Sequence, residues 1–171
     1  MTRSRIWMAA AMALVVLVLA AAYYGAPYWT VHELKQAARD RDADALLVHV
    51  DQAALRKSVQ LALGFSLAPS PASPESQATA RSMLEAMPEL LSSPTSLMAM
   101  LLQGHPSRVL DPEAAFVPVL PEAADGDWPV ELRYVGRSTV EVRAKGATGG
   151  AFILRRAGLF RWKWSAIGSA S

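Results

Sequence analysis

The pattern of apolar positions begins with an unbroken apolar run from Ile6 to Tyr24, which holds no charge, Gly or Pro. As a helix, its 19 residues would be about 28 Å long, close to the roughly 30 Å hydrocarbon core of a bilayer. A globular helix of this length normally shows a polar face, and this one has none. The run therefore predicts a membrane-inserting segment within residues 1–25.

The flanks of the run indicate its orientation. Arg3 and Arg5 precede it, which favours a cytoplasmic N-terminus and an exported domain. Two fates fit such a segment, an uncleaved signal-anchor or a signal peptide cleaved near Ala20–Ala22. We favour the anchor, because the apolar core of a signal peptide is usually only about 7–15 residues long.

Residues 27–104 then show helical spacing of apolar positions. Gly25-Ala26 is expected to end the membrane segment, and Pro27 suits the first turn of a new helix that runs to Arg41. Further helices are predicted over 42–50, from Asp51 to Gly64, over 78–92, and from near Pro94 to Gly104, separated by a loop over 65–77 and followed by a loop over 105–129.

After residue 129 the period changes to two, which is the period of strands. Short glycine-containing connections join four such segments, which predicts an antiparallel meander of four strands over 130–167. Helices first and hairpins afterwards indicate an α+β fold: an N-terminal transmembrane or signal helix, then a single domain over 26–168 whose helices pack on one face of the sheet.

The strand alternation sorts the side chains into two candidate sets. One face is aromatic and would form the core or line a pocket: Tyr134, Phe152, Phe160, Trp162 and Trp164. The other face is basic and is a candidate membrane-facing surface: Arg133, Arg143, Lys145, Arg155, Arg161 and Lys163.

The charge layout fits either of two interpretations. The net charge is only +2, but residues 75–129 hold eight acids and two bases, whereas residues 130–171 hold eight bases and two acids. The two parts could balance each other within the domain, with Glu131 and Glu141 pairing across strands. Alternatively, the basic face could contact anionic lipid headgroups. An exported location and aromatic side chains that point toward the core argue against nucleic acid as a binding partner.

Sequence motifs for catalysis or metal binding are missing. The chain has no Cys, which excludes disulfides and thiolate chemistry, and His32, His49 and His105 lack the spacing of a ligand pair. It contains neither a Gly-x-Ser-x-Gly elbow nor a glycine-rich phosphate loop. We therefore expect no catalytic residues, no cofactor and no metal, and hence not an enzyme.

The residues after the apolar run resemble a known family. The segment from Pro27 to Val59 combines a Pro-Tyr-Trp entry, Ala37 to Arg39, Asp42 to Leu46, Val50-Asp51 and Ala54 to Arg56, and residues 158–168 are similar to the family's last strand. These features resemble the bacterial domain of unknown function 2939 family over residues 20–168. Gly168-Ser169 stands where that family usually has Leu-Pro. The resemblance implies an N-terminally anchored envelope protein and supplies no catalytic residues.

Together these observations favour a non-enzymatic, membrane-tethered envelope protein that binds a partner protein or a lipid surface. The expected location is the inner membrane, single-pass, with a cytoplasmic N-terminus and a periplasmic domain, or else the periplasm after signal cleavage. Helices followed by a curved sheet also resemble nuclear-transport-factor-2-like folds. By that analogy, the alternative function is a pocket for a small hydrophobic ligand.

Overall fold

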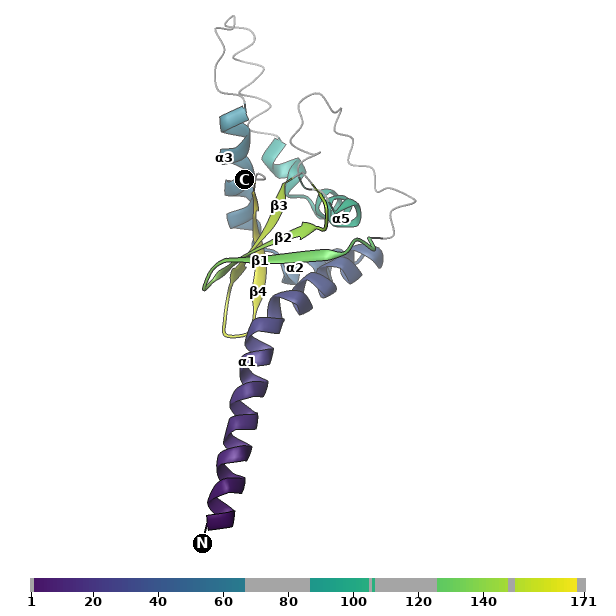
Figure 1. Ribbon diagram of the computed structural model, residues 1–171. Helices are drawn as coiled ribbons and strands as arrows, with labels where there is room; N and C mark the ends of the chain where they lie inside the picture. The colour runs from purple at the N-terminus through teal and green to yellow at the C-terminus, as the bar shows by residue number, and fades with distance from the viewer. Residues whose placement is uncertain (1, 67–86, 105, 107–125, 148–149, 169–171) are drawn as a thin grey trace, which may run out of the picture.

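The computed structural model describes residues 2–66, 87–104, 106, 126–147 and 150–168 (Figure 1). It has the predicted α+β architecture, with an N-terminal apolar helix, further helices and a four-stranded antiparallel sheet. The elements are α1 (Thr2–Arg39), α2 (Ala43–Val48), α3 (Gln52–Ser66), α5 (Pro94–Gln103), β1 (Val130–Gly136), β2 (Thr139–Ala144), β3 (Ala151–Arg156) and β4 (Trp162–Gly168).

Helix α1 is continuous, so the prediction that one helix ends before Pro27 and another begins there is wrong. Pro27 has no N–H for the carbonyl of Tyr23, and its ring crowds the preceding turn, which bends a helix without necessarily ending it. Figure 1 shows that the first part of α1 projects away from the domain, whereas the part after the bend lies beneath the domain. The two parts therefore have different surroundings although they belong to one helix.

The short helices begin where the sequence predicts, because side chains cap them. The carboxylate of Asp42 accepts the backbone N–H of Ala45 at 2.9 Å, and that of Asp51 accepts the N–H of Ala54 at 3.1 Å. Ser93 caps α5 in the same way, directly before Pro94. The predicted stop at Gly64 is wrong, since α3 continues to Ser66.

Parts of the other predicted segments lie outside the described residues. This applies to most of the loops predicted over 65–77 and 105–129, and to the first part of the helix predicted over 78–92. Residues 87–91 of that helix are helical, and residues 126–129 lead without regular structure into β1.

The sheet is the predicted meander, with strand order β1-β2-β3-β4 and antiparallel pairing throughout. It twists strongly, so β1 and β4 cross in Figure 1. The segment between α2 and α3 adds to the edge at β4: the N–H of Asp51 donates to the carbonyl of Trp164, and the N–H of Trp164 donates to that of His49, both at 2.8 Å. This pairing occupies backbone groups that an exposed edge strand would leave open.

The core lies between the inner face of the sheet and the helices. Phe152, Trp162 and Trp164 are almost completely buried there. Among the α1 side chains whose burial is described, those that join this core all follow Gly25 and include Val31, Leu34 and Ala38.

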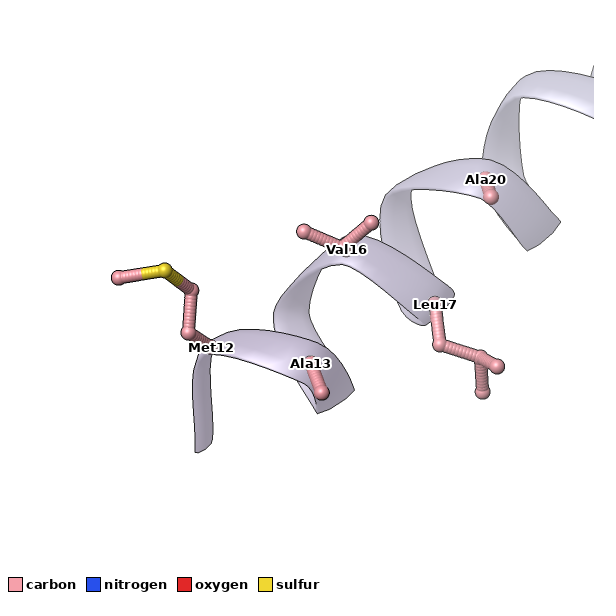
Figure 2. A pocket seen from close by; sticks show the side chains of 5 residues that line it. All are labelled: Met12, Ala13, Val16, Leu17 and Ala20. Atoms are coloured by element: carbon pink, nitrogen blue, oxygen red, sulfur yellow. The ribbon is translucent and has the colours of Figure 1, made fainter. Parts of the chain in front are cut away.

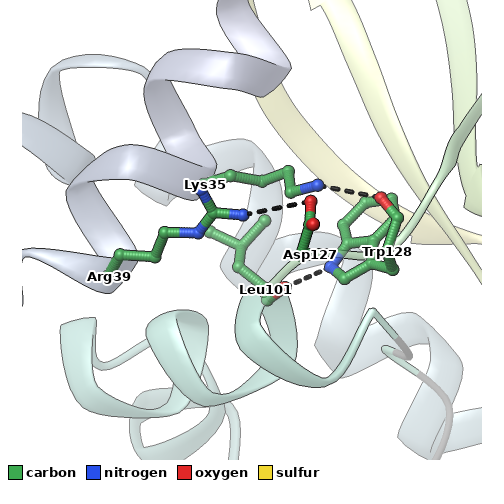
Figure 3. A network of polar contacts seen from close by, with 5 residues as sticks. All are labelled: Lys35, Arg39, Leu101, Asp127 and Trp128. Carbon is green, nitrogen blue, oxygen red and sulfur yellow. Dashed lines mark hydrogen bonds and ion pairs between the residues drawn. The ribbon is translucent and has the colours of Figure 1, made fainter. Parts of the chain in front are cut away.

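The segment before β1 is fixed by a polar network at the junction of α1 and α5 (Figure 3). The Trp128 indole Nε1–H donates to the carbonyl of Leu101 at 2.6 Å, and the Lys35 ammonium donates to the carbonyl of Trp128 at 2.8 Å. Arg39 pairs with Asp127 at 3.5 Å. The network positions the start of β1, and with it the register of the sheet, over the C-terminal part of α1.

Gly104 is essential to this arrangement, because it ends α5 with a φ of 70° and lies against Trp128. A Cβ built there would be 2.9 Å from Cγ of Trp128, whereas at Gly146, with a φ of 81°, it would meet nothing within 4 Å. The two glycines thus share the left-handed backbone but differ in the space around them.

We expect both Gly104→Ala and Gly146→Ala to lose roughly 1–2 kcal/mol from the left-handed backbone. Gly104→Ala should lose about 1–3 kcal/mol more, because its Cβ overpacks the Trp128 site. The measurement is the unfolding of the full chain in detergent micelles, followed by tryptophan fluorescence. Equal losses in the two variants would show that Trp128 is not packed against Gly104.

Candidate functional site

The strand register decides which basic side chains share the outer face of the sheet. Arg133 lies opposite Glu141, Arg143 opposite Glu131, and Arg155 opposite Lys163. These residues therefore form one surface, as the alternation predicts. The two remaining members of the predicted basic face lie beside it, Lys145 in the turn after β2 and Arg161 just before β4.

An acidic residue balances part of the positive charge on this surface. Oε2 of Glu141 lies 3.3 Å from Nη2 of Arg143 and 4.0 Å from Nη1 of Arg133. By contrast, no ion pair joins Arg155 or Lys163 to a carboxylate of the described residues. The excess positive charge on the outer face therefore lies on the β3–β4 side.

The predicted aromatic face divides into a packed core and exposed members. The rings of Phe152 and Trp164 meet edge to face at 5.1 Å, and Trp162 and Trp164 are at most 1% exposed. Tyr134 is 39% exposed, and Phe160 is 47% exposed because β4 begins only at Trp162, so Phe160 lies in the hairpin before it. Phe160 is therefore not a core residue. Trp162 and Trp164 belong to the buried core cluster.

Tyr134 and Arg156 lie at one end of the inner face of the sheet. The register pairs Tyr134 with Val140 and Arg156 with Trp162, and Val140 and Trp162 are core residues. Both positions are next to the hairpins that connect β1 to β2 and β3 to β4. At this end the sheet meets α1 just before its bend, where the guanidinium of Arg156 lies 3.7 Å from the centroid of the Tyr23 ring.

A pocket of about 540 Å³ lies at this meeting point, lined by Tyr23, Tyr24, Tyr134, Gly136, Arg137 and Arg156. It combines residues of α1 with residues of both hairpins. Its walls are therefore mainly aromatic, and its charged groups are two guanidinium groups. Such a lining suits an anion that also carries apolar parts.

Arg156 is held in the wall of this pocket with part of its hydrogen-bonding capacity unused. Its guanidinium lies between the rings of Tyr23 and Trp162, 4.6 Å from the latter centroid, and Nη1 donates to the carbonyl of Leu159 at 3.2 Å. Nε and Nη2 are buried and have no acceptor among the described residues. The two rings stabilise the cation, but they leave two N–H groups unsatisfied, which is costly for a buried charged group.

A direct hydrogen bond joins α1 to the sheet beside Arg156. The hydroxyl of Tyr134 donates to the backbone carbonyl of Tyr24 at 2.7 Å, and the two rings meet edge to face at 6.1 Å. Tyr24 lies in the turn that precedes Pro27, where α1 bends. The bend and the hydrogen bond thus fix the end of the sheet against α1.

The β3–β4 hairpin presents apolar side chains beyond this junction. The N–H of Ala157 donates to the carbonyl of Arg161 at 2.8 Å and closes the loop, while Leu159 and Phe160 are 74% and 47% exposed. Figure 1 shows the hairpin beside the part of α1 that precedes the bend. Its tip therefore lies level with the last turns of the apolar run.

The first part of α1 exposes apolar side chains on all sides. It belongs to a candidate span over Ala10–Arg39, which contains an 18-residue window with a mean hydropathy of 1.9 and is, by length and composition, long and apolar enough to cross a membrane. Figure 2 shows a shallow hollow on its surface, formed by Met12, Ala13, Val16, Leu17 and Ala20. A helix of this kind serves as a membrane anchor or as a signal sequence.

The histidines lie away from the pocket. Nε2 of His49 is 3.4 Å from Oε2 of Glu33, and His32 is exposed on α1, while His105 lies outside the described residues. Within the described part of the chain, no three His, Cys, Asp or Glu side chains are grouped to hold a metal ion.

Sequence reasoning named Tyr134 as a possible pocket residue but missed the other residues that line this pocket, although one signal for the site was present. Phe152, Leu154 and Arg156 share the inward parity of β3, so Arg156 is a charged residue at a position where the pattern calls for an apolar one. A long cationic side chain at the end of an apolar face indicates a site where the core meets a polar surface or a ligand. The contribution of Tyr23 and Tyr24 depends on the bend of α1 and has no comparable local signal.

A family model described as "Protein of unknown function (DUF2939)" matches residues 16–101, about half of the chain. The chain belongs to this family. The match covers the end of the apolar run and the helices up to α5, whereas the sheet lies outside it. No curated protein and no solved structure matches the chain. For this DUF2939 member, function therefore has to be inferred from its own geometry.

Tyr134 offers a test of the junction between the sheet and α1. Burial raises the pKa of Tyr134 above its ordinary value of 10.0, and the positive charge of Arg156 opposes part of that rise. A raised pKa keeps the hydroxyl protonated, so its bond to the carbonyl of Tyr24 is fully present below pH 10 and is lost as the pH rises through the higher value.

We expect Tyr134→Phe to lose about 1 kcal/mol of stability at neutral pH. The difference in melting temperature from the wild-type chain should shrink only above pH 10, and the tyrosinate absorbance difference should titrate there too. Tyr28→Phe, at an exposed position of α1, is the control for removing a hydroxyl. Titration of Tyr134 at or below pH 10 would contradict its burial.

Proposed function

We propose that this protein is a single-pass membrane protein whose domain lies on the bilayer surface and acts as a non-enzymatic lipid-surface-binding module. The observation that carries the proposal is the position of the β3–β4 hairpin. The hairpin lies beside the part of α1 that precedes the bend (Figure 1), and its residues Leu159 and Phe160 are exposed. A domain anchored there would bring this tip to the interfacial region of the same leaflet.

The chemistry around the hairpin suits that region. Arg155, Arg161 and Lys163 flank the apolar tip in the sequence, and basic residues near an anionic surface contribute roughly 1 kcal/mol each. Tyr23 and Tyr24 lie at the end of the apolar run, where amphipathic rings are favoured at the headgroup level. An apolar wedge with a basic surround is the usual composition of an interfacial membrane contact.

The contacts of α1 also favour an uncleaved anchor. Cleavage after Ala22 would make Tyr23 the first residue and place a charged amino group next to the guanidinium of Arg156, which lies over the Tyr23 ring. It would also leave the turn that carries the Tyr24 carbonyl at a frayed helix end. With two arginines before the run, we place the N-terminus in the cytoplasm and the domain on the outer side of a bacterial inner membrane.

The anchor makes a direct prediction. The full chain of 18.4 kDa should stay in the membrane fraction after alkaline extraction, with Met1 or Thr2 as its N-terminus. Alkaline phosphatase fused after Ser171 should be active, because that enzyme folds only outside the cytoplasm. A mature chain that begins near Tyr23 would establish cleavage, and an inactive fusion would overturn the orientation.

The hairpin contact can be measured by spin labelling, since the natural chain has no Cys. Single variants Leu159→Cys and Leu61→Cys both replace exposed leucines, but Leu61 lies on α3, far from the anchor (Figure 1). In nanodiscs containing anionic lipid, the label at 159 should be accessible to oxygen and shielded from a polar nickel reagent. The label at 61 should show the opposite preference.

The surface-binding proposal fails if both labels are equally accessible to the nickel reagent. In nanodiscs of zwitterionic lipid alone, the label at 159 should lie closer to the water phase. The basic residues near the tip, Arg155, Arg161 and Lys163, then have no anionic headgroups to attract them. Lack of any dependence on lipid charge would restrict the contact to the apolar tip.

A further inference from the structure

The pocket between α1 and the two hairpins contains charge that the protein itself does not balance. Arg156 is half-buried, with Nε and Nη2 buried and without an acceptor among the described residues. Arg137 lines the same pocket from the exposed β1–β2 hairpin. No carboxylate of the described residues forms an ion pair with either guanidinium. A cluster of two cations without an anion is stabilised by any anion that enters it.

The surroundings select the kind of anion. Tyr23, Tyr24 and Tyr134 form apolar walls that end in hydroxyl groups, and the volume of about 540 Å³ far exceeds that of a single small ion. Guanidinium forks bind phosphate oxygens through paired N–H groups. The pocket also lies at the end of the apolar run, the depth at which phospholipid phosphates are found when the anchor spans a bilayer.

We propose that the pocket binds a phosphate-type anion between Arg137 and Arg156, and that an anionic phospholipid headgroup supplies it. This inference rests on the proposed membrane attachment, because the bilayer delivers the ligand at that depth. In this arrangement, Arg156 turns its unused N–H edge toward the phosphate and keeps its stacking on Tyr23 and Trp162. Arg137 closes the pocket from the outer side.

The site is connected to the membrane-facing hairpin. Nη1 of Arg156 donates to the carbonyl of Leu159, so an anion that fixes Arg156 also fixes the tip of the β3–β4 hairpin. Headgroup binding and insertion of the tip would thus favour each other through one side chain.

The test uses the full chain in detergent micelles, titrated with dihexanoyl phosphatidylglycerol, dihexanoyl phosphatidylcholine and inorganic phosphate, with calorimetric detection. We expect phosphatidylglycerol to bind more tightly than phosphatidylcholine, which carries the same phosphate but also a cationic group. Inorganic phosphate that binds as tightly as phosphatidylglycerol would confirm the anion site and identify free phosphate as its source. No binding of either anion would overturn the proposal.

A matched pair of variants locates the site. Arg137→Gln and Arg56→Gln each remove one exposed positive charge, but Arg137 lines the pocket, whereas Arg56 lies on α3 and outside the proposed lipid-binding residues. Arg137→Gln should weaken phosphatidylglycerol binding roughly tenfold, as expected for the loss of a charge-assisted hydrogen bond, and Arg56→Gln less than twofold. Equal effects would show general surface attraction and would overturn the pocket.

Arg156→Lys keeps the charge and removes the fork, and we expect weaker binding with the fold retained. If these variants bind like wild type while the spin label at Leu159 still reports the lipid interior, the pocket is wrong and the proposed membrane attachment stands. If the label reports water and phosphatidylglycerol still binds in an Arg137-dependent way, the anion site stands and the surface contact fails.

Discussion

Helix α1 has to be stable in two surroundings, and the rest of the structure depends on how it passes between them. Before Gly25 its apolar side chains are exposed in every direction, whereas after Gly25 a single stripe, with Val31 and Leu34, packs into the domain core. Pro27 bends the helix at this boundary without ending it, and the neighbouring carbonyl of Tyr24 receives the hydroxyl of Tyr134. This bond and the stacking of Arg156 on Tyr23 fix the sheet against the part of α1 that precedes the bend.

Arg156 shows how a core can end at a polar boundary. Its inward position continues the row of Phe152 and Leu154, but at the last residue of β3 the row reaches α1 and the pocket instead of further core. The stem and the stacked guanidinium cover Trp162, while the charge lies toward the hairpins. The same side chain thus closes the core at this end and places a positive charge beside the aromatic residues of the pocket.

Much of the fold could be predicted from the sequence because its signals are local. The period of two defines the meander, and Asp42, Asp51 and Ser93–Pro94 start helices through contacts with residues only a few positions away. The continuity of α1 could not be predicted, because a proline in a helix interior and one at a helix start look alike in sequence. The pocket depends on that continuity, since Tyr24 and Tyr134 meet across 110 positions. The outer basic face and a cross-strand pair of Glu141 could both be predicted from the alternation, whereas the shorter contact of Glu141 with Arg143 on the same strand depends on rotamers.

The unbroken backbone of α1 has a mechanical consequence. A domain on a flexible linker turns independently of the helix before it, but here the domain packs against α1 on both sides of the bend, through Tyr23 and Tyr24 before it and through Val31 and Leu34 after it. Rotation of the first part of α1 about its own axis therefore turns the domain as well. In the membrane attachment proposed above, the rotational orientation of α1 in the bilayer would set the direction in which the outer face of the sheet points.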